Sequence, residues 1–592
     1  MLNKIAFKAL RQKWRDYSVL LIGTTIAVAI FYMFTNIAMN EELLRSLSTM
    51  TQKMIVFVFV LGQILLGVIT FVYLNFANSF LVRLRQKDYG LLSMLGATKH
   101  QIGSLLLRET LLLGLISSIL GVFVGMGITK LSGQALMQSI GIKLSHWSVG
   151  TPKVVLVTIG FFLLIFLFNG LYNRWRLMRL DTLTLLQADH VVSAKKVNPK
   201  RQLILGLLGI ILLGTSYAIM PKVVQWQMIG LTVDLILNVT GTYLFVGQTL
   251  GLVTYWIGKS EFGQKGLRNF INGQLRFRLD EYKRILTMIA VLFGLALGAI
   301  SVGQGYYVSL PKQAVENDAL TLATKNPKTD FADLKDVTYQ AQLDYVVKDQ
   351  TVYFNKDSVK KAQVPTLVYQ QNGQPDAKPK QTTVDVNHPE DAYTLSTLAN
   401  YVTGVPFGSD VQLVNQLPAG KQEIIKLVKV KDLQANESVL KKMAANEKAY
   451  MSNPDEMIPG AYGNLITLKT IFGGLEFMSI FLGIAFLIML ASTLMFKTLS
   501  NVSLDRRRYE ILAMIGTTPQ QLRLTAFKDV GILFFIPMLI GLMDATMGMQ
   551  IFKPIMPDPY SGFSLGLMLV LGIYGGYYIL TSLIYQRLVL KK

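Results

Sequence analysis

Residues 89–102 read YGLLSMLGATKHQI, and residues 509–522 read YEILAMIGTTPQQL. The two stretches align without gaps, with six identities in fourteen positions. Each stretch lies between two apolar runs of helical length, so each is expected to join two neighbouring helices. Internal repetition of this kind indicates a duplicated architecture. We therefore predict two related units, each built around one copy of this turn.

Ten apolar runs have the length of a membrane-spanning helix. A bilayer core of roughly 30 Å needs about 20 apolar residues in a helix, and a chain with 51% hydrophobic and 16% charged residues is unlike a soluble protein. We expect an all-α polytopic membrane protein. The first run is too long for a signal peptide and no cleavage site follows it. The predicted spans are 18–38, 54–78, 103–129, 152–172, 203–220, 227–257, 285–309, 470–496, 525–551 and 563–586.

Lysine and arginine gather in every second segment between these spans. By the positive-inside rule, these segments and both termini are predicted to be cytoplasmic, in the cell membrane. Residues 4–15 predict an amphipathic helix on inner-leaflet lipids. The distribution of the net charge of +22 therefore indicates a membrane protein, and no nucleic-acid partner is expected. The basic groups lie within 4–15, 83–87, 174–201, 265–284, 506–508 and 587–592.

Residues 310–469 have a different composition, since they contain no arginine and are rich in polar residues. Alternating stretches at 337–347 and 351–354 predict strands, and 437–450 predicts a helix. We expect one extracellular α+β domain between helices seven and eight, long enough for its own core. The predicted division is a four-helix unit at 1–180 with its turn at 83–102, a linker at 181–265 with helices five and six, an amphipathic segment and helix seven at 266–309, the domain at 310–469, and helices eight to ten at 470–592 with the turn at 503–522.

Each repeated turn predicts a short apolar helix, a glycine stop and a capped new helix. Gly96 and Gly516 suit the left-handed conformation that ends a helix, and each capping threonine has glutamine at N3. The short helices carry more apolar surface than a cytosolic loop normally exposes. This favours docking into a groove of a partner protein, with a helix lying on lipid headgroups as the alternative. The predicted coupling residues are Tyr89, Leu91, Leu92, Met94, Leu95, Gly96, Thr98, Tyr509, Ile511, Leu512, Met514, Ile515, Gly516 and Thr518.

A basic and acidic pair recurs about ten residues after each capping threonine. The pairs are Arg108 with Glu109 and Lys528 with Asp529, roughly 15 Å along each helix. They are either interfacial charges on helices that protrude into the cytoplasm, or buried groups that lock the turn to its neighbours and transmit its motion. The second interpretation requires partners, since an isolated charge in the bilayer centre costs about 2.5 to 3.5 kcal/mol.

Asp234 and Asp544 lie inside apolar runs. An intramembrane carboxylate is a functional candidate by default, but a proton relay needs a chain of such groups. We expect these two to make hydrogen bonds between helices.

No catalytic, metal or cofactor site is expected in this chain. It has no cysteine, and its four histidines, His100, His146, His190 and His388, are scattered. Gly258-Lys259-Ser260 ends like a phosphate-binding loop, but the first glycine of that motif is replaced by Val253. The chain is therefore not expected to be an enzyme.

The sequences MLGAT at 94–98 and MIGTT at 514–518, in a basic turn, resemble the signature of FtsX-like permeases. These are the membrane subunits of type VII (mechanotransmission) ABC transporters. Ten helices with a large domain between helices seven and eight are similar, across essentially the whole chain, to Bce-type peptide-antibiotic permeases of Gram-positive bacteria. The resemblance implies two copies of a separate ABC ATPase, which binds ATP and Mg, and a sensor histidine kinase.

The same resemblance implies resistance to, and sensing of, cell-wall-active antimicrobial peptides such as bacitracin or lantibiotics. The peptide, or its complex with a lipid intermediate, would be bound outside the cell. One alternative is a lipoprotein-release or cell-division permease, although those typically have fewer helices. The other is an ATPase-independent sensor scaffold or secondary transporter.

Overall fold

The computed structural model describes residues 14–45, 49–140, 148–179, 199–261, 267–349, 351–368, 380–386, 398–402, 410–451, 456–500, 502–554, 556 and 558–590. Ten of its helices are long and apolar enough to cross a membrane, so the ten predicted spans are confirmed. They are α2 (Trp14–Ala38), α4 (Thr49–Leu84), α6 (Lys99–Ile140), α7 (Pro152–Met178), α9 (Pro199–Ile219), α10 (Val223–Leu244) with its continuation α11 (Leu250–Lys259), α13 (Leu267–Glu316), α17 (Ala461–Ser500), α19 (Pro519–Gly548) and α20 (Phe563–Val589).

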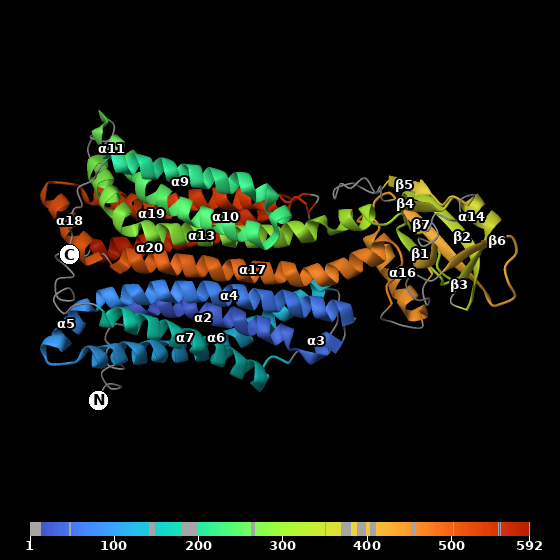
Figure 1. The fold of residues 1–592 in the computed structure, drawn as a ribbon, viewed down its shortest axis with the longest axis horizontal. Helices are drawn as coiled ribbons and strands as arrows, with labels where there is room; N and C mark the ends of the chain where they lie inside the picture. The colour runs from blue at the N-terminus through green and yellow to red at the C-terminus, as the bar shows by residue number, and fades with distance from the viewer. Residues whose placement is uncertain are drawn as a thin grey trace.

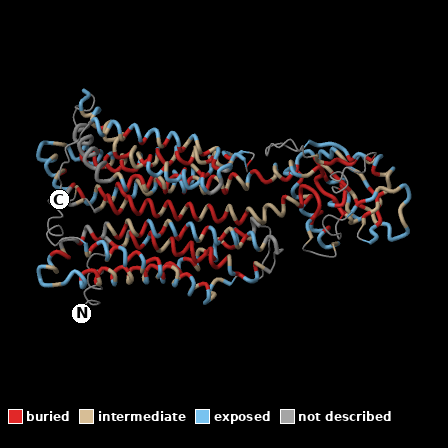
Figure 2. Tube along the Cα trace, in the orientation of Figure 1, coloured by how far each residue is buried: buried red, intermediate tan, exposed pale blue. Residues whose placement is uncertain are grey.

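The helices form two bundles that lie side by side (Figure 1). One contains α2, α4, α6 and α7, and the other contains α13, α17, α19 and α20 with α9 and α10 on its outer side. Helix α17 packs against α13 in its own bundle and against α2 and α4 in the other. The apolar windows of α2 and α17 are 83% and 78% buried, against 28% for α9, and Figure 2 shows the same contrast. The molecule is therefore organised around α2 and α17.

The α+β domain is built on a five-stranded sheet with the order β1-β7-β2-β3-β6. Strand β2 covers the predicted strand 337–347, and helix α16 has the predicted bounds, so the mixed composition is confirmed. A separate hairpin pairs β4 with β5. The elements are β1 (Leu322–Thr324), β2 (Val337–Lys348), β3 (Thr351–Asn355), α14 (Lys356–Ala362), β4 (Pro365–Val368), β5 (Lys380–Thr383), β6 (Val411–Val414), β7 (Gln422–Val430) and α16 (Glu437–Tyr450).

Helices α13 and α17 run from the bundle into this domain without a break (Figure 1). Leu310 of α13 and Leu465 of α17 belong to the same buried cluster as Val428 of β7 and Leu440 of α16. The ends of both helices are therefore part of the domain core, which ties the domain rigidly to the second bundle.

The two helices also approach each other very closely near that end. A Cβ placed on Gly303 would lie 1.7 Å from Ser479 Oγ, and one placed on Gly483 would lie 2.4 Å from Ile300 Cγ1. The rings of Tyr306 and Phe472 stack with centroids 4.3 Å apart. Because only glycine fits at these positions, α13 and α17 pack as a single two-helix stalk.

Candidate functional site

The repeated turns lie at the end of the molecule opposite the α+β domain (Figure 1). The first follows α5 (Gln86–Met94) and leads into α6, and the second follows α18 (Val502–Met514) and leads into α19. Gly96 and Gly516 have φ of +91° and +95°. The following residue in each copy, Ala97 or Thr517, donates its backbone N–H five residues back, at 3.0 and 3.2 Å. Both short helices therefore end as predicted, in a Schellman motif.

Both new helices begin with a capping box. Thr98 Oγ1 accepts from Gln101 N at 3.3 Å, and Gln101 Oε1 accepts from Thr98 N at 3.0 Å. Thr518 and Gln521 make the same pair of bonds at 3.4 and 3.2 Å, with Pro519 at N1. Since the backbone donors are satisfied within the turn itself, each turn is a rigid corner that holds two helices at a fixed angle.

Each corner presents an apolar knuckle to its surroundings. We use this name for Leu91, Met94 and Leu95 in the first copy and Ile511, Met514 and Ile515 in the second, whose exposed fractions run from 49% to 84%. Clusters of exposed apolar side chains of this kind often mark surfaces that bind a protein or a membrane.

The other apolar members of the predicted coupling set face inward. Leu92 packs against the buried cluster that contains Ile102, and Leu512 packs partly against the main core. Tyr89 and Tyr509 are fully buried. The structure therefore separates the set into an exposed surface and four side chains that hold the corner in place.

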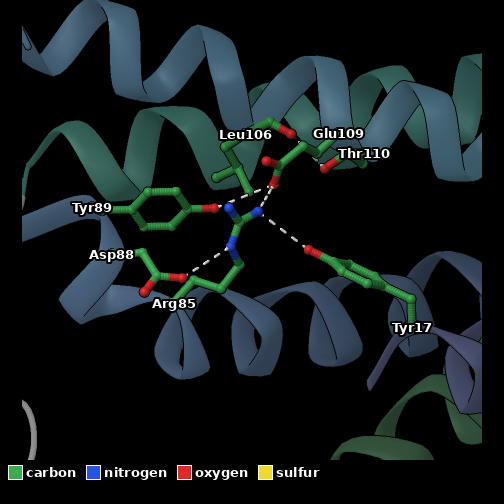
Figure 3. Close-up of polar contacts among 7 residues, drawn as sticks. All are labelled: Tyr17, Arg85, Asp88, Tyr89, Leu106, Glu109 and Thr110. Atoms are coloured by element: carbon green, nitrogen blue, oxygen red, sulfur yellow. Dashed lines mark hydrogen bonds and ion pairs between the residues drawn. The ribbon is translucent and has the colours of Figure 1, made fainter. Parts of the chain in front are cut away.

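The first corner is anchored by a buried ion pair (Figure 3). The Arg85 guanidinium, just before α5, contacts Glu109 Oε2 of α6, and its Nη1 donates to Tyr17 OH of α2 at 3.3 Å. Arg85 Nε lies 3.7 Å from Asp88 Oδ2. Tyr89 OH lies 3.5 Å from Glu109 Oε2. The corner is thus joined by charge to α6 and by a hydrogen bond to α2.

The second corner is anchored differently at the same positions. Asp529 of α19, which corresponds to Glu109, accepts from Tyr509 OH at 2.9 Å. The position of Arg85 is occupied by Asp505, which accepts from Tyr585 OH of α20 at 2.8 Å and lies 3.6 Å from Arg508 Nη1. The repeat therefore preserves the shape of the corner while the charges that secure it have changed.

The structure also splits the predicted basic and acidic pairs. Glu109 and Asp529 are buried, whereas Arg108 and Lys528 are exposed. Each acid is enclosed by neighbouring helices, as the second interpretation requires, while the position of the pairs relative to the bilayer stays a prediction. Sequence reasoning missed Arg85 as the partner of Glu109. The alignment of the two repeats contained a signal for it. Extending the alignment by four residues toward the N-terminus places Arg85 opposite Asp505.

Asp234 and Asp544 make the predicted hydrogen bonds between helices. Asp234 of α10 accepts from Ser216 Oγ of α9 at 2.5 Å. Asp544 Oδ1 of α19 accepts from Tyr217 OH at 2.7 Å and from Asn238 Nδ2 at 2.8 Å. The Asp544 contacts attach the α9–α10 pair to the second bundle, and the Asp234 contact joins α9 to α10.

Two of the remaining sequence features, the Gly258-Lys259-Ser260 segment and His100, lie in the described part of the chain. No group of three histidine, cysteine or acidic side chains there could hold a metal ion. Gly258, Lys259 and Ser260 lie at the end of α11, so they form no phosphate-binding loop. The exposed His100 is hydrogen-bonded to Arg174 at 2.7 Å. The segment 4–13 of the predicted amphipathic helix lies outside the described residues, as do His146, His190 and His388.

A family model described as FtsX-like permease C-terminal matches residues 57–182. This part of the chain is similar to FtsX-like permeases. The matched part runs from α4 through the first corner to α7, and the second corner repeats its central motif. With ten apolar helices, the chain is a multi-pass membrane protein.

Curated relatives extend this similarity. The bacitracin export permease protein BceB of Bacillus subtilis is 25% identical over 344 residues, covering 55% of this chain and 52% of that protein. BceB of Halalkalibacterium halodurans is 26% identical, covering 53% and 49%. The match thus spans about half the length of these two relatives. The ABC transporter permease protein YxdM of Bacillus subtilis is 22% identical, over all of this chain and 99% of that protein.

Proposed function

We propose that this chain is the membrane permease subunit of an ABC transporter, and that its two corners dock a separate ATPase. The single observation that carries the proposal is the pair of exposed apolar knuckles, one per bundle, at the end opposite the α+β domain. A lipid-bound helix would lie back toward the bilayer, whereas α5 and α18 occupy the far end of the molecule (Figure 1). Two equivalent corners suit two copies of one ATPase, which would hold ATP and Mg.

The orientation follows from the same proposal. Docking of an ATPase puts both corners in the cytoplasm and the α+β domain outside the cell, in agreement with the positive-inside rule. Helix α17 has 40 residues, so it is about 60 Å long. It begins in the domain core and is followed in the chain by α18, the short helix of the second corner. Closure of the ATPase would therefore reach the domain through the stalk, as mechanotransmission requires.

We infer the biological task from the relatives, two of which are named bacitracin export permeases. The proposed task is resistance to, and sensing of, cell-wall-active antimicrobial peptides. The external domain would engage the peptide or its complex with a lipid intermediate. A sensor histidine kinase in the same membrane would be the partner that reads transporter activity.

Co-purification tests the docking step. The full-length chain is expressed in its native host with an affinity tag, extracted in mild detergent, and examined for an ABC ATPase by mass spectrometry. We expect the wild type to retain an ATPase and the variant with Met94→Asp, Leu95→Asp, Met514→Asp and Ile515→Asp to lose it. All four side chains are exposed, so the thermal midpoint of the variant should stay close to that of the wild type.

A matched control carries the same change far from the corners. Val347→Asp alters an exposed apolar residue on β2 of the domain and should leave ATPase association unchanged. Retention of the ATPase by the fourfold variant would refute docking at the knuckles. Absence of any ATPase from the wild-type sample would instead favour the ATPase-independent scaffold.

A further inference from the structure

A cluster of five polar side chains lies where the α9–α10 pair meets the second bundle. We call it the carboxyl node, and its members are Ser216, Tyr217, Asp234, Asn238 and Asp544. Ser216 and Tyr217 are adjacent on α9, and Asp234 and Asn238 are one turn apart on α10. Each acid accepts from one of the two adjacent α9 residues, so this one segment of α9 links both carboxyl groups.

Within the described part of the chain, the node has no matching positive charge. Asp234 and Asp544 are only 7% and 9% exposed, and neither takes part in an ion pair among the described residues. Asp544 accepts from Tyr217 of α9 and Asn238 of α10, and Asp234 of α10 is close enough to interact with it electrostatically. On the α13 side, a Cβ built on Gly294 would lie 3.3 Å from the Asp544 Cβ. Among the described residues, the only charged group near Asp544 is thus another carboxyl, that of Asp234.

The two oxygens of Asp544 are used unequally. Oδ1 accepts two hydrogen bonds, while Oδ2 is buried and has no hydrogen-bond partner among the described residues. This is the pattern of a carboxylic acid, in which one oxygen accepts as a carbonyl does and the other carries hydrogen. Without a partner, a buried carboxylate oxygen costs more than a buried neutral O–H group, because the desolvation penalty is larger for a charged group.

We propose that Asp544 is a binding site for a single monovalent cation, normally a proton on Oδ2. Two carboxylates in one apolar site repel each other, and one bound cation removes that repulsion. Binding involves no change in covalent bonds other than the O–H bond formed with a proton from water. Occupancy would fasten α9 and α10 to α19, and loss of the cation would place two negative charges across that contact and loosen it.

Chemical labelling tests the site directly. The full chain in lipid nanodiscs is treated with dicyclohexylcarbodiimide, which reacts with protonated carboxyl groups in apolar surroundings, and the modified residues are located by mass spectrometry. We expect labelling of Asp544 that falls as the buffer is made more alkaline. Protection of Asp544 by sodium chloride, but not by choline chloride, would identify sodium as a competing occupant. An absence of protection by either salt would identify the proton alone.

Asp544→Asn is the matched variant, because its amide oxygen can still accept from Tyr217 and Asn238 and its amide carries no charge. It should lose the label and keep a thermal midpoint close to that of the wild type. Infrared spectroscopy gives a second readout: the wild type should show a carboxylic-acid carbonyl band that Asp544→Asn lacks. Absence of both the label and that band at acidic and neutral pH would show a permanently charged Asp544 and overturn the proposal.

Discussion

Replacing Glu109 with glutamine should loosen the first corner and leave the second unchanged. The side chains of Arg85 and Glu109 are 7% and 3% exposed, so the variant leaves a buried guanidinium beside a neutral amide. Removing one partner of a buried ion pair costs about 3 to 5 kcal/mol. Because glutamine retains one acceptor oxygen, we expect about 3 kcal/mol. That value corresponds to a roughly 100-fold increase in local opening.

Hydrogen–deuterium exchange of the full chain in nanodiscs measures this opening at each corner separately. Peptides from α5 should exchange faster in Glu109→Gln, while peptides from α18 serve as the internal reference. Adding Arg85→Met to a Glu109→Leu variant should restore slow exchange, since an apolar pair in place of a buried ion pair is often neutral or stabilising. Unchanged exchange of α5, or an equal increase in α18, would refute the reasoning.

The repeat supplies a matched comparison. Tyr509 OH donates to Asp529 at 2.9 Å, whereas Tyr89 OH lies at the 3.5 Å limit from Glu109. Tyr509→Phe should therefore cost about 1 to 2 kcal/mol and Tyr89→Phe less than about 0.5 kcal/mol. A larger effect of Tyr89→Phe on corner exchange would contradict the structure.

Three further predictions concern other parts of the chain. Gly96→Ala and Gly516→Ala should each destabilise their corner by about 1 to 2 kcal/mol. The cost is backbone strain alone, since a Cβ at either site meets no atom within 4 Å. Equal increases in hydrogen–deuterium exchange of α5 and α18 would check this. Gly303→Ala should lower the thermal midpoint by forcing α13 from α17, an overpacking cost of about 1 to 3 kcal/mol, and Ser479→Gly should rescue it because the clash is with that side chain. Burial raises the pKa of Asp318 from 3.8 to about 6, so the fold holds this proton more tightly than the unfolded chain does. Stability should fall by at most about 3 kcal/mol as pH rises from about 4 to 6, and melting curves of Asp318→Asn should lack that step.

The corners could be predicted because their determinants are local. A glycine stop and a threonine cap act on neighbours within five residues, and the periodicity of apolar residues is enough to show a membrane span. The partners of the buried charges could not be predicted in this way. Asp544 meets Tyr217 and Asn238 across 327 and 306 positions of the chain, and only tertiary packing brings them together.

The predicted ends of two helices also differ from the observed ends. Helix α17 begins at Ala461, before the predicted start at 470, and α13 continues past Pro311 to Glu316. An apolar-run criterion finds the part of a helix that crosses lipid. It cannot detect the extra turns of α13 and α17, because these turns lie in the core of the α+β domain.

The stalk has a geometric consequence for the size of any movement. A rod about 60 Å long that tilts by about 10° at one end moves its other end by about 10 Å. Because α17 enters the domain core directly, no loop between them would absorb that displacement. A tilt of about 10° at the second corner would thus displace the α+β domain by about the diameter of one helix.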